Sequence, residues 1–396
     1  MAVHFSSRVD VSRPNAISAA EARCRRDGIA LAKLNDSNPT RHGLAPALVP
    51  DVYEANPRGP LAARRALAGF LAAGGAEGGV TRAVDPERLY LLSSTSEAYS
   101  WLMKLLCDAG DAVLAPKPGY PLIESIARLE NVEAIEYSLL FDGSWFFDLP
   151  RIEEILDSDE GTRIRAMVLI NPNNPTGSYV KPGERRRLVE LCREHDVAII
   201  ADEVFFGYDL EPFDGNARIA GEAGALTFAL DGFSKMLAAP HAKVGWIEVS
   251  GPENDVAEAQ ARLDVIADDF LPMSDIIAER IPALLDAAAG QTARVRERTR
   301  GNLARLHELL AADPSGVTSV LRAEGGWNVL LRFPSSIDET ELVLSLIRRH
   351  RATAQPGFFF DMTSNGYLAV SLLPEPAVFE SGMRAVLAAV GEMLGE

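Results

Sequence analysis

The sequence predicts an α/β protein whose large domain has a mostly parallel sheet flanked by helices, followed by a small α+β domain. Apolar strand-like runs alternate with stretches of helical periodicity, the pattern of parallel strands joined by helical crossovers. The chain has 396 residues, 47% of them hydrophobic, and a mean hydropathy of +0.01. This length and composition suit a globular protein with two domains and a large buried core.

The predicted elements follow one another in chain order. Strands of the large domain are expected at 89–92, 112–115, 166–170, 197–201 and 227–230, with helices at 97–107, 122–129 and 185–195. After Pro252 the pattern is helical to about Ala312, and shorter strands are expected at 317–321, 328–332 and 368–372. We therefore predict a large domain of residues 51–285, a small domain of residues 286–396, and an N-terminal segment, residues 1–50, that packs on the small domain.

Charge and composition exclude several classes of function. The 39 basic and 56 acidic residues give a net charge of −17, whereas nucleic acids and anionic membranes attract clustered basic surfaces. No run of about 18 apolar residues is present, and the first residues do not begin a signal peptide, so we expect no membrane partner and a cytoplasmic location. Cys24, Cys107 and Cys192 lack metal-ligand or redox spacing, and we expect reduced thiols and no metal.

Lys235 is the first candidate for chemistry. It lies in Asp231-Gly232-Phe233-Ser234-Lys235, directly after the apolar run 226–230. Partial desolvation at the end of a buried strand lowers the pKa of a lysine and frees its amine as a nucleophile for a Schiff base. The same pentapeptide also fits an ordinary loop lysine.

Three more segments place polar residues after expected strands. Asn171-Pro172-Asn173-Asn174-Pro175-Thr176-Gly177 follows one strand, Asp202-Glu203 ends another, and Ser93-Ser94-Thr95-Ser96 leads from a third into a helix. Free N–H groups and the dipole at that helix start favour a phosphate. Each segment alone also fits a turn, a solvated loop or a helix cap, but the four in this order and spacing indicate one site.

With these segments the sequence resembles the fold-type-I pyridoxal-phosphate enzymes, specifically the class I/II aminotransferases related to aspartate aminotransferase, from about Leu34 to the C-terminus. The resemblance implies the PLP-dependent transferase fold type I and pyridoxal 5'-phosphate as cofactor. It also implies an amino donor and a carbonyl acceptor as small-molecule substrates, and a homodimer with shared active sites. The internal aldimine would form on Lys235, which would also move the proton between substrate and cofactor.

The resemblance implies roles for further residues. Asp202 would pair with the pyridine nitrogen and keep the ring protonated as an electron sink, Asn174 would bond the phenolic oxygen, and Tyr120 would stack on the ring. The phosphate would be held by the hydroxyl residues Ser94, Thr95, Ser96 and Ser234. Tyr53 would reach the phosphate of the neighbouring subunit, although an aromatic packed at a domain edge is the alternative.

The chain departs from the family pattern at the cofactor. Lys243 stands where an arginine is usual, which keeps the charge for the phosphate but loses the bidentate fork. Phe205 stands where a tyrosine normally contacts the phenolic oxygen, and our hypothesis is a raised aldimine pKa. Gly232 stands where a phosphate-binding serine is common.

The departure with the largest consequence is Ala369, where the family usually has an arginine that clamps the substrate carboxylate. Either another cation replaces it, with Arg41 first and Arg322 or His241 behind it, or the substrate has no α-carboxylate there. We predict that Asn38 and Arg41 bind substrate, although Arg41 equally fits a surface charge.

The sequence therefore predicts a PLP-dependent aminotransferase acting on an amino acid or related amine. The departures resemble a bacterial subgroup of these proteins that shares Gly325-Gly326-Trp327 and also lacks the arginine. The alternative is a PLP enzyme of specialised metabolism on the same fold, doing elimination, replacement, cyclisation or oxidation. A non-catalytic binding protein is disfavoured, because Lys235, Asp202 and Asn174 form a complete cofactor set.

Overall fold

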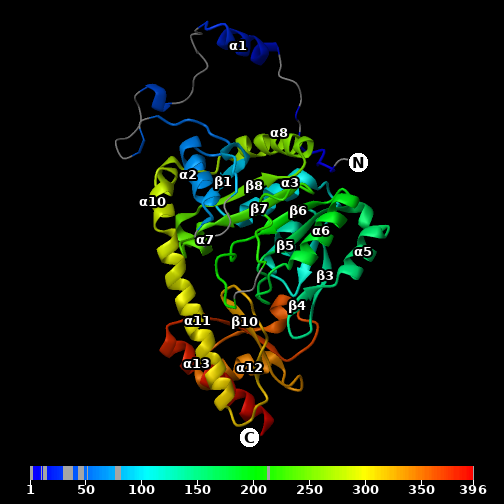
Figure 1. Ribbon diagram of the computed structural model, residues 1–396, viewed down its shortest axis with the longest axis vertical. Coiled ribbons are helices and arrows are strands. Elements are labelled where there is room, and N and C mark those ends of the chain that lie inside the picture. The colour runs from blue at the N-terminus through cyan, green and yellow to red at the C-terminus, as the bar shows by residue number, and fades with distance from the viewer. Residues whose placement is uncertain are drawn as a thin grey trace.

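The computed structural model describes residues 3–9, 11, 16–29, 39–42, 49–50, 52–75, 82–211 and 215–395. Its larger part, which we call the large domain, is built on an eight-stranded sheet (Figure 1). The strands are β1 (Leu89–Leu92), β2 (Ala112–Lys117), β3 (Glu133–Phe141), β4 (Trp145–Phe147), β5 (Ile164–Ile170), β6 (Ala198–Asp202), β7 (Thr227–Gly232) and β8 (Gly245–Ser250).

The large sheet is mostly parallel, which confirms the predicted fold class. Its order is β1-β8-β7-β6-β5-β2-β3-β4, and the neighbours from β7 to β3 pair in parallel. β8 pairs antiparallel with both β7 and β1, and β4 closes the other edge antiparallel to β3. The sequence prediction did not contain β3, β4 or β8. Charged residues, among them Glu136 and Glu248, interrupt the apolar runs of β3 and β8, and β4 is only three residues long.

Helices cover both faces of this sheet. One core cluster joins α3 (Thr95–Leu106), α4 (Leu122–Leu129) and α8 (Glu253–Phe270) to strand residues such as Val168. The other joins α5 (Leu149–Asp157) and α6 (Pro182–Glu194) to the next residues along the same strand, Met167 and Leu169. Because successive side chains of a strand point to opposite faces, a sheet covered on both sides needs apolar residues at nearly every position.

The remaining helices of the large domain lie on the β1 side of the large sheet (Figure 1). They are α2 (Leu61–Ala72), the one-turn α7 (Phe233–Met236), α9 (Asp275–Ala278) and α10 (Ile281–Asp286). Leu67, Phe233 and Trp246 share one apolar cluster there, so the chain around α7 is packed rather than loose. A further helix, α1 (Ala16–Arg26), precedes them in the chain.

The second part, which we call the small domain, has an antiparallel sheet in the order β11-β12-β10-β9. Its elements are β9 (Ser319–Val320), β10 (Asn328–Arg332), β11 (Gln355–Pro356), β12 (Tyr367–Ser371), α12 (Glu339–Ser345) and α13 (Pro376–Leu394). The long helix α11 (Ala288–Ala312) runs down its side and packs against α13 (Figure 1). The α+β character of this region agrees with the sequence, and the domain boundary near residue 285 stays a prediction.

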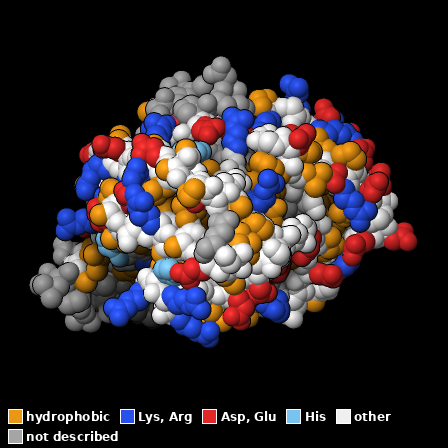
Figure 2. Space-filling model, turned by 90° about the horizontal axis from the view of Figure 1, so that it is seen from below, with side chains coloured by type: hydrophobic (Ala, Val, Ile, Leu, Met, Phe, Trp, Pro, Cys, Tyr) orange, Lys and Arg blue, Asp and Glu red, His pale blue; other side chains and the backbone are white. Residues whose placement is uncertain are grey.

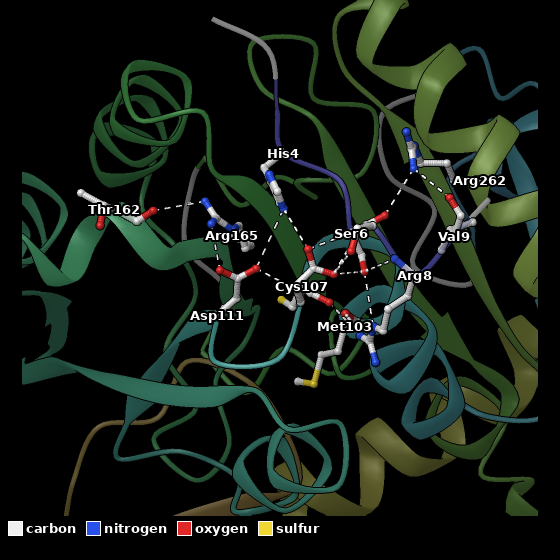
Figure 3. Close-up of polar contacts among 12 residues, drawn as sticks. His4, Ser6, Arg8, Val9, Met103, Cys107, Asp111, Thr162, Arg165 and Arg262 are labelled. Atoms are coloured by element: carbon white, nitrogen blue, oxygen red, sulfur yellow. Dashed lines mark hydrogen bonds and ion pairs between the residues drawn. The ribbon is translucent and has the colours of Figure 1, made fainter. Parts of the chain in front are cut away.

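Residues 3–9 lie on the large domain (Figure 3). The Ser6 backbone N–H donates to the carbonyl oxygen of Leu105 at 2.9 Å, its hydroxyl donates to Asp108 Oδ1 at 2.7 Å, and Arg8 donates to two backbone carbonyl groups at the end of α3. This corrects the expectation that residues 1–50 pack as a whole on the small domain. Much of the rest of that segment, including Asn38, lies outside the described residues.

Seen from the small-domain end, acidic and basic side chains are interspersed with apolar ones (Figure 2). In the part of the chain that the structure describes, no helix combines the length and apolar character needed to cross a bilayer. The three cysteines are free thiols, with Cys107 and Cys192 buried in the two cores of the large sheet.

Candidate active site

A cavity of about 640 Å³ opens where the carboxyl ends of the parallel strands meet. Open α/β sheets bind ligands at this edge, because the loops that leave the strands converge there. We call it the strand-end cavity. It brings together most of the predicted site residues, namely Ser94, Thr95, Ser96, Tyr120, Asn174, Asp202, Ser234, Lys235 and Lys243.

Lys235 enters the cavity from α7, directly after β7. Its Nζ lies 5.4 Å from the ring centre of Phe205 and 5.3 Å from that of Trp327. The Tyr208 hydroxyl donates to the carbonyl oxygens of Lys235 and Met236, at 2.6 and 3.0 Å, and so fixes the backbone of this turn. Burial lowers the pKa of Lys235, against the opposing attraction of Asp202, so its amine loses a proton more readily than an exposed lysine.

Asp202 ends β6 and faces the same cavity. The Tyr99 hydroxyl donates to its Oδ2 at 2.9 Å, and the Val204 N–H donates to its Oδ1 at 3.2 Å. Burial raises the pKa of Asp202 to about 6, while these two hydrogen bonds act in the opposite direction. These hydrogen bonds hold the carboxylate in one orientation. Any positive group that binds beside it would favour its ionised form and lower its pKa.

The neighbouring carboxylate, Glu203, has a structural role instead. It is buried, accepts from the Ile219 N–H at 2.6 Å, and lies 3.5 Å from the Arg218 guanidinium. Of the two acidic residues at the end of this strand, only Asp202 lines the cavity.

At the start of α3 the cavity is lined by groups that suit an anion. Ser94 is the N-cap, and its Oγ accepts from the Glu97 N–H at 3.2 Å, which leaves its own O–H to donate. The first backbone N–H groups of a helix have no partner within the helix and carry the positive end of its dipole. A Cβ on Gly245 would lie 3.0 Å from the Ser94 carbonyl carbon, so a side chain there would have to push the start of α3 away by a few tenths of an ångström. Lys243, in a left-handed conformation with φ 52°, adds a positive charge.

The small domain supplies residues that the sequence did not predict. Trp327, Asn328 and Gln355 line the cavity, and Asn328 Nδ2 donates to Asn174 Oδ1 at 2.9 Å. Tyr99 was missed as well, because a tyrosine on the buried face of a helix carries no signal until the fold places it beside Asp202. The Gly325-Gly326-Trp327 motif was the one available hint, and it gave no role.

The candidates for carboxylate binding are not assembled in this single chain. Ala369 is 3% exposed on β12, opposite Leu330 and Gln355. Arg322 is exposed and pairs with Glu211 at 2.9 Å. Among the described residues, neither Arg322, His241 nor Arg41 lines the strand-end cavity.

Tyr53 does not line the strand-end cavity of its own chain either. It is 40% exposed, and its backbone N–H donates to Thr40 Oγ1 at 2.8 Å. Its role toward a neighbouring subunit therefore stays a prediction, as does that of Arg41.

Comparison with known proteins agrees with this geometry. Residues 55–378 match the family "Aminotransferase class I and II", and the chain belongs to this family. It is 31% identical over 258 residues to glutamate-pyruvate aminotransferase AlaA of Haemophilus influenzae, covering 62% of this chain and 61% of that protein. The chain thus matches about three fifths of the length of this relative.

Two further matches show the breadth of the family. An S-alkyl-thiohydroximate lyase of Arabidopsis thaliana is 31% identical over 237 residues, covering 58% of this chain and 48% of that protein. An aminotransferase structure from Escherichia coli superimposes with a TM-score of 0.75 at 23% identity, covering 99% of each chain. The fold is therefore that of the aminotransferases, the PLP-dependent transferase fold type I.

The cavity residues fit pyridoxal phosphate. An amine with a lowered pKa, a buried carboxylate and an anion site surround one space, and these suit an aldehyde, a pyridine nitrogen and a phosphate. Tyr120 is 47% exposed beside them and offers an aromatic face for the ring.

Proposed function

We propose that the protein is a pyridoxal-phosphate-dependent aminotransferase that moves an amino group from an amino acid or related amine to a carbonyl acceptor. The observation that carries the proposal is the convergence of Lys235, Asp202 and the α3 anion site on one cavity. The similarity to glutamate-pyruvate aminotransferase AlaA supports the reaction class, and the substrates stay open.

The protein groups have separate tasks in this proposal. When bound, the cofactor supplies an electron sink for the bonds at the substrate carbon. Lys235 Nζ would hold the aldehyde carbon in the resting enzyme and would afterwards carry the proton, since burial lowers its pKa and so favours the neutral amine. Asp202 holds the positive pyridinium, and Asn174 donates to the phenolic oxygen. Ser94, Thr95, Ser96, Ser234 and Lys243 bind the phosphate.

The predicted assembly belongs to the same proposal. We propose a homodimer in which Tyr53 and Arg41 complete the partner's cavity, because both lie away from the cavity of their own chain. A cytoplasmic location is proposed with it.

The test is to mix purified protein with a panel of amino donors and follow the visible absorbance of the cofactor. Transamination predicts conversion to the amine form of the cofactor together with one equivalent of keto product. Lys104→Ala is a matched control, because Lys104 lies on α3 and pairs with Glu130 outside the cavity. A protein that binds no cofactor, or binds it without reaction with any amine, contradicts the proposal.

A second candidate is elimination on the same cofactor. Two observations favour it: Ala369 removes the usual carboxylate clamp, and the chain is similar to an S-alkyl-thiohydroximate lyase. Release of a thiol or other leaving group, without conversion of the cofactor to its amine form, would support elimination over transamination.

A further inference from the structure

Asn328 begins β10 in the small domain, and its side chain crosses to Asn174 in the large domain. The Nδ2 of Asn328 donates to Oδ1 of Asn174 at 2.9 Å, and both half-buried side chains line the strand-end cavity. Within the part of the chain that the structure describes, this is the only hydrogen bond that either side-chain amide makes. Among the described residues, this contact is therefore the one hydrogen bond that orients the Asn174 amide.

The polarity of this bond decides what Asn174 can do. A side-chain amide has one oxygen that accepts and one nitrogen with two donors. With Oδ1 bonded to Asn328, the Nδ2 of Asn174 remains to donate to an acceptor in the cavity. If Asn174 alone were rotated by half a turn, its nitrogen would face the Asn328 nitrogen and its oxygen would face the cavity, so the contact would be lost unless Asn328 rotated with it.

We propose that Asn328 is a positioning residue, which holds the Asn174 amide with its N–H groups toward the phenolic oxygen of the cofactor. This inference rests on the proposed function. It matters more in this chain than in one with a tyrosine at position 205, because Phe205 offers no hydroxyl for the same oxygen. Since Asn328 belongs to the small domain, the position of that domain sets the orientation of a group that touches the cofactor.

The consequence is a shift in a protonation equilibrium. The phenolic oxygen carries more negative charge when the nitrogen that joins Lys235 to the cofactor has lost its proton. A donor at this oxygen therefore stabilises the deprotonated form and lowers the pKa of that nitrogen. Loss of the Asn328 contact should raise this pKa.

The test is a double-mutant cycle read by the pH midpoint of the cofactor's visible absorbance. Asn328→Ala should raise the midpoint by about 0.5 to 1 pH unit, the shift that one neutral hydrogen bond can produce. Asn174→Ala should raise it at least as much. In the Asn174→Ala background the Asn328→Ala change should have no further effect, because Asn328 acts through Asn174.

A buried asparagine of the same domain gives the matched control. Asn302 donates to the carbonyl oxygens of Leu372 and Pro374, both at 2.8 Å, so Asn302→Ala should lower the unfolding temperature without moving the midpoint. The isosteric Asn328→Asp, which accepts but does not donate when ionised, tests the contact if the alanine variant does not fold. It should raise the midpoint in the wild-type background.

An unchanged midpoint in Asn328→Ala or Asn328→Asp would overturn the inference. Equal effects of Asn328→Ala in the presence and absence of Asn174 would overturn it too, since they would show that Asn328 acts by another route. A wild-type protein without any visible band would instead contradict the proposed function.

Discussion

The two walls of the strand-end cavity are built differently. The large-domain wall consists of residues that end or directly follow buried strands, such as Asp202 and Lys235, and the paired sheet fixes their relative positions. The small-domain wall consists of Trp327, Asn328 and Gln355, which reach the cavity from a separate four-stranded sheet. The large-domain wall holds the groups that suit the cofactor. Behind the small-domain wall, Ala369 pairs with Gln355 on β11 and does not itself line the cavity.

This difference separates the groups that should act on every substrate from the groups that should discriminate between substrates. At the cofactor end the chain keeps Lys235, Asp202 and Asn174 of the family pattern, although Lys243, Phe205 and Gly232 depart from it. At the small-domain end we expect the groups that distinguish one substrate from another. Variants on the large-domain wall should therefore affect every substrate alike, whereas variants that act on the substrate should discriminate between substrates.

The largest effect is expected from Lys235→Ala. Without the amine, the cofactor has no covalent attachment, and no group at that place can carry the proton, so the visible band of the linked cofactor and the activity toward all donors should both disappear. Borohydride reduction followed by mass spectrometry measures the attachment. Finding the adduct on another lysine of the variant would show that the assignment is wrong.

A smaller effect, still common to all substrates, is expected from Asp202→Asn. The variant should keep the cofactor, because the phosphate contacts are elsewhere, but lose about 100- to 1,000-fold in kcat as the charge that stabilises the positive ring is removed. Asp231→Asn is the matched control, because Asp231 lies near the end of the neighbouring strand β7, pairs with Arg218 at 3.0 Å and does not line the cavity. Near-normal turnover of Asp202→Asn would contradict its role.

The same contrast explains what the sequence could predict. Lys235, Asp202 and Asn174 were predictable because each follows an apolar run, and parallel strands bring their carboxyl ends to one edge. Asn328 was not, because its partner lies 154 residues away on another domain. Tyr99 was not, because helical periodicity assigns it to the core, where a hydroxyl meets Asp202 only once α3 is packed on the sheet.

The fold shows the same limit. β10 agrees with its prediction at both ends, whereas β8 was missed because its pairing with β7 and β1, rather than its own apolar character, makes it a strand. Residues that act across a subunit boundary, as predicted for Tyr53 and proposed for Arg41, are a third class, whose positions depend on a second chain.

The Arg41→Ala variant tests whether the missing clamp is replaced from outside the small-domain wall. If Arg41 binds the substrate carboxylate, its loss should raise KM for a carboxylate-bearing donor by roughly 10- to 150-fold, the equivalent of roughly 1.5 to 3 kcal/mol for a charge-assisted contact. The cofactor absorbance should not change. Arg151→Ala is the control, because that side chain is exposed, pairs with Glu154 at 3.0 Å and does not line the cavity.

Unchanged KM and kcat in Arg41→Ala would remove Arg41 from the substrate site. Lys243 would then be tested next, because it lines the cavity, with the cofactor absorbance as a second readout since Lys243 is also the proposed phosphate ligand. If simple amino acids are poor donors for the wild type as well, the substrate presents no carboxylate at that place.

The smallest effect is expected from Tyr99→Phe, which removes one hydroxyl from the large-domain wall and keeps the ring. Burial raises the pKa of Asp202 to about 6, and the Tyr99 hydrogen bond opposes that rise by stabilising the carboxylate. Loss of the hydroxyl should therefore raise this pKa further, by about 0.5 to 1 unit. Because Asp202 must be ionised to hold the positive ring, activity falls as the pH drops through the pKa of Asp202. In Tyr99→Phe that fall should begin at higher pH.

The acid limb of the pH profile of kcat measures this shift in pKa, which should have the same size for all donors. A shift that differs between donors would place Tyr99 in contact with substrate, and an unchanged limb would show that the Val204 N–H is sufficient to hold the carboxylate.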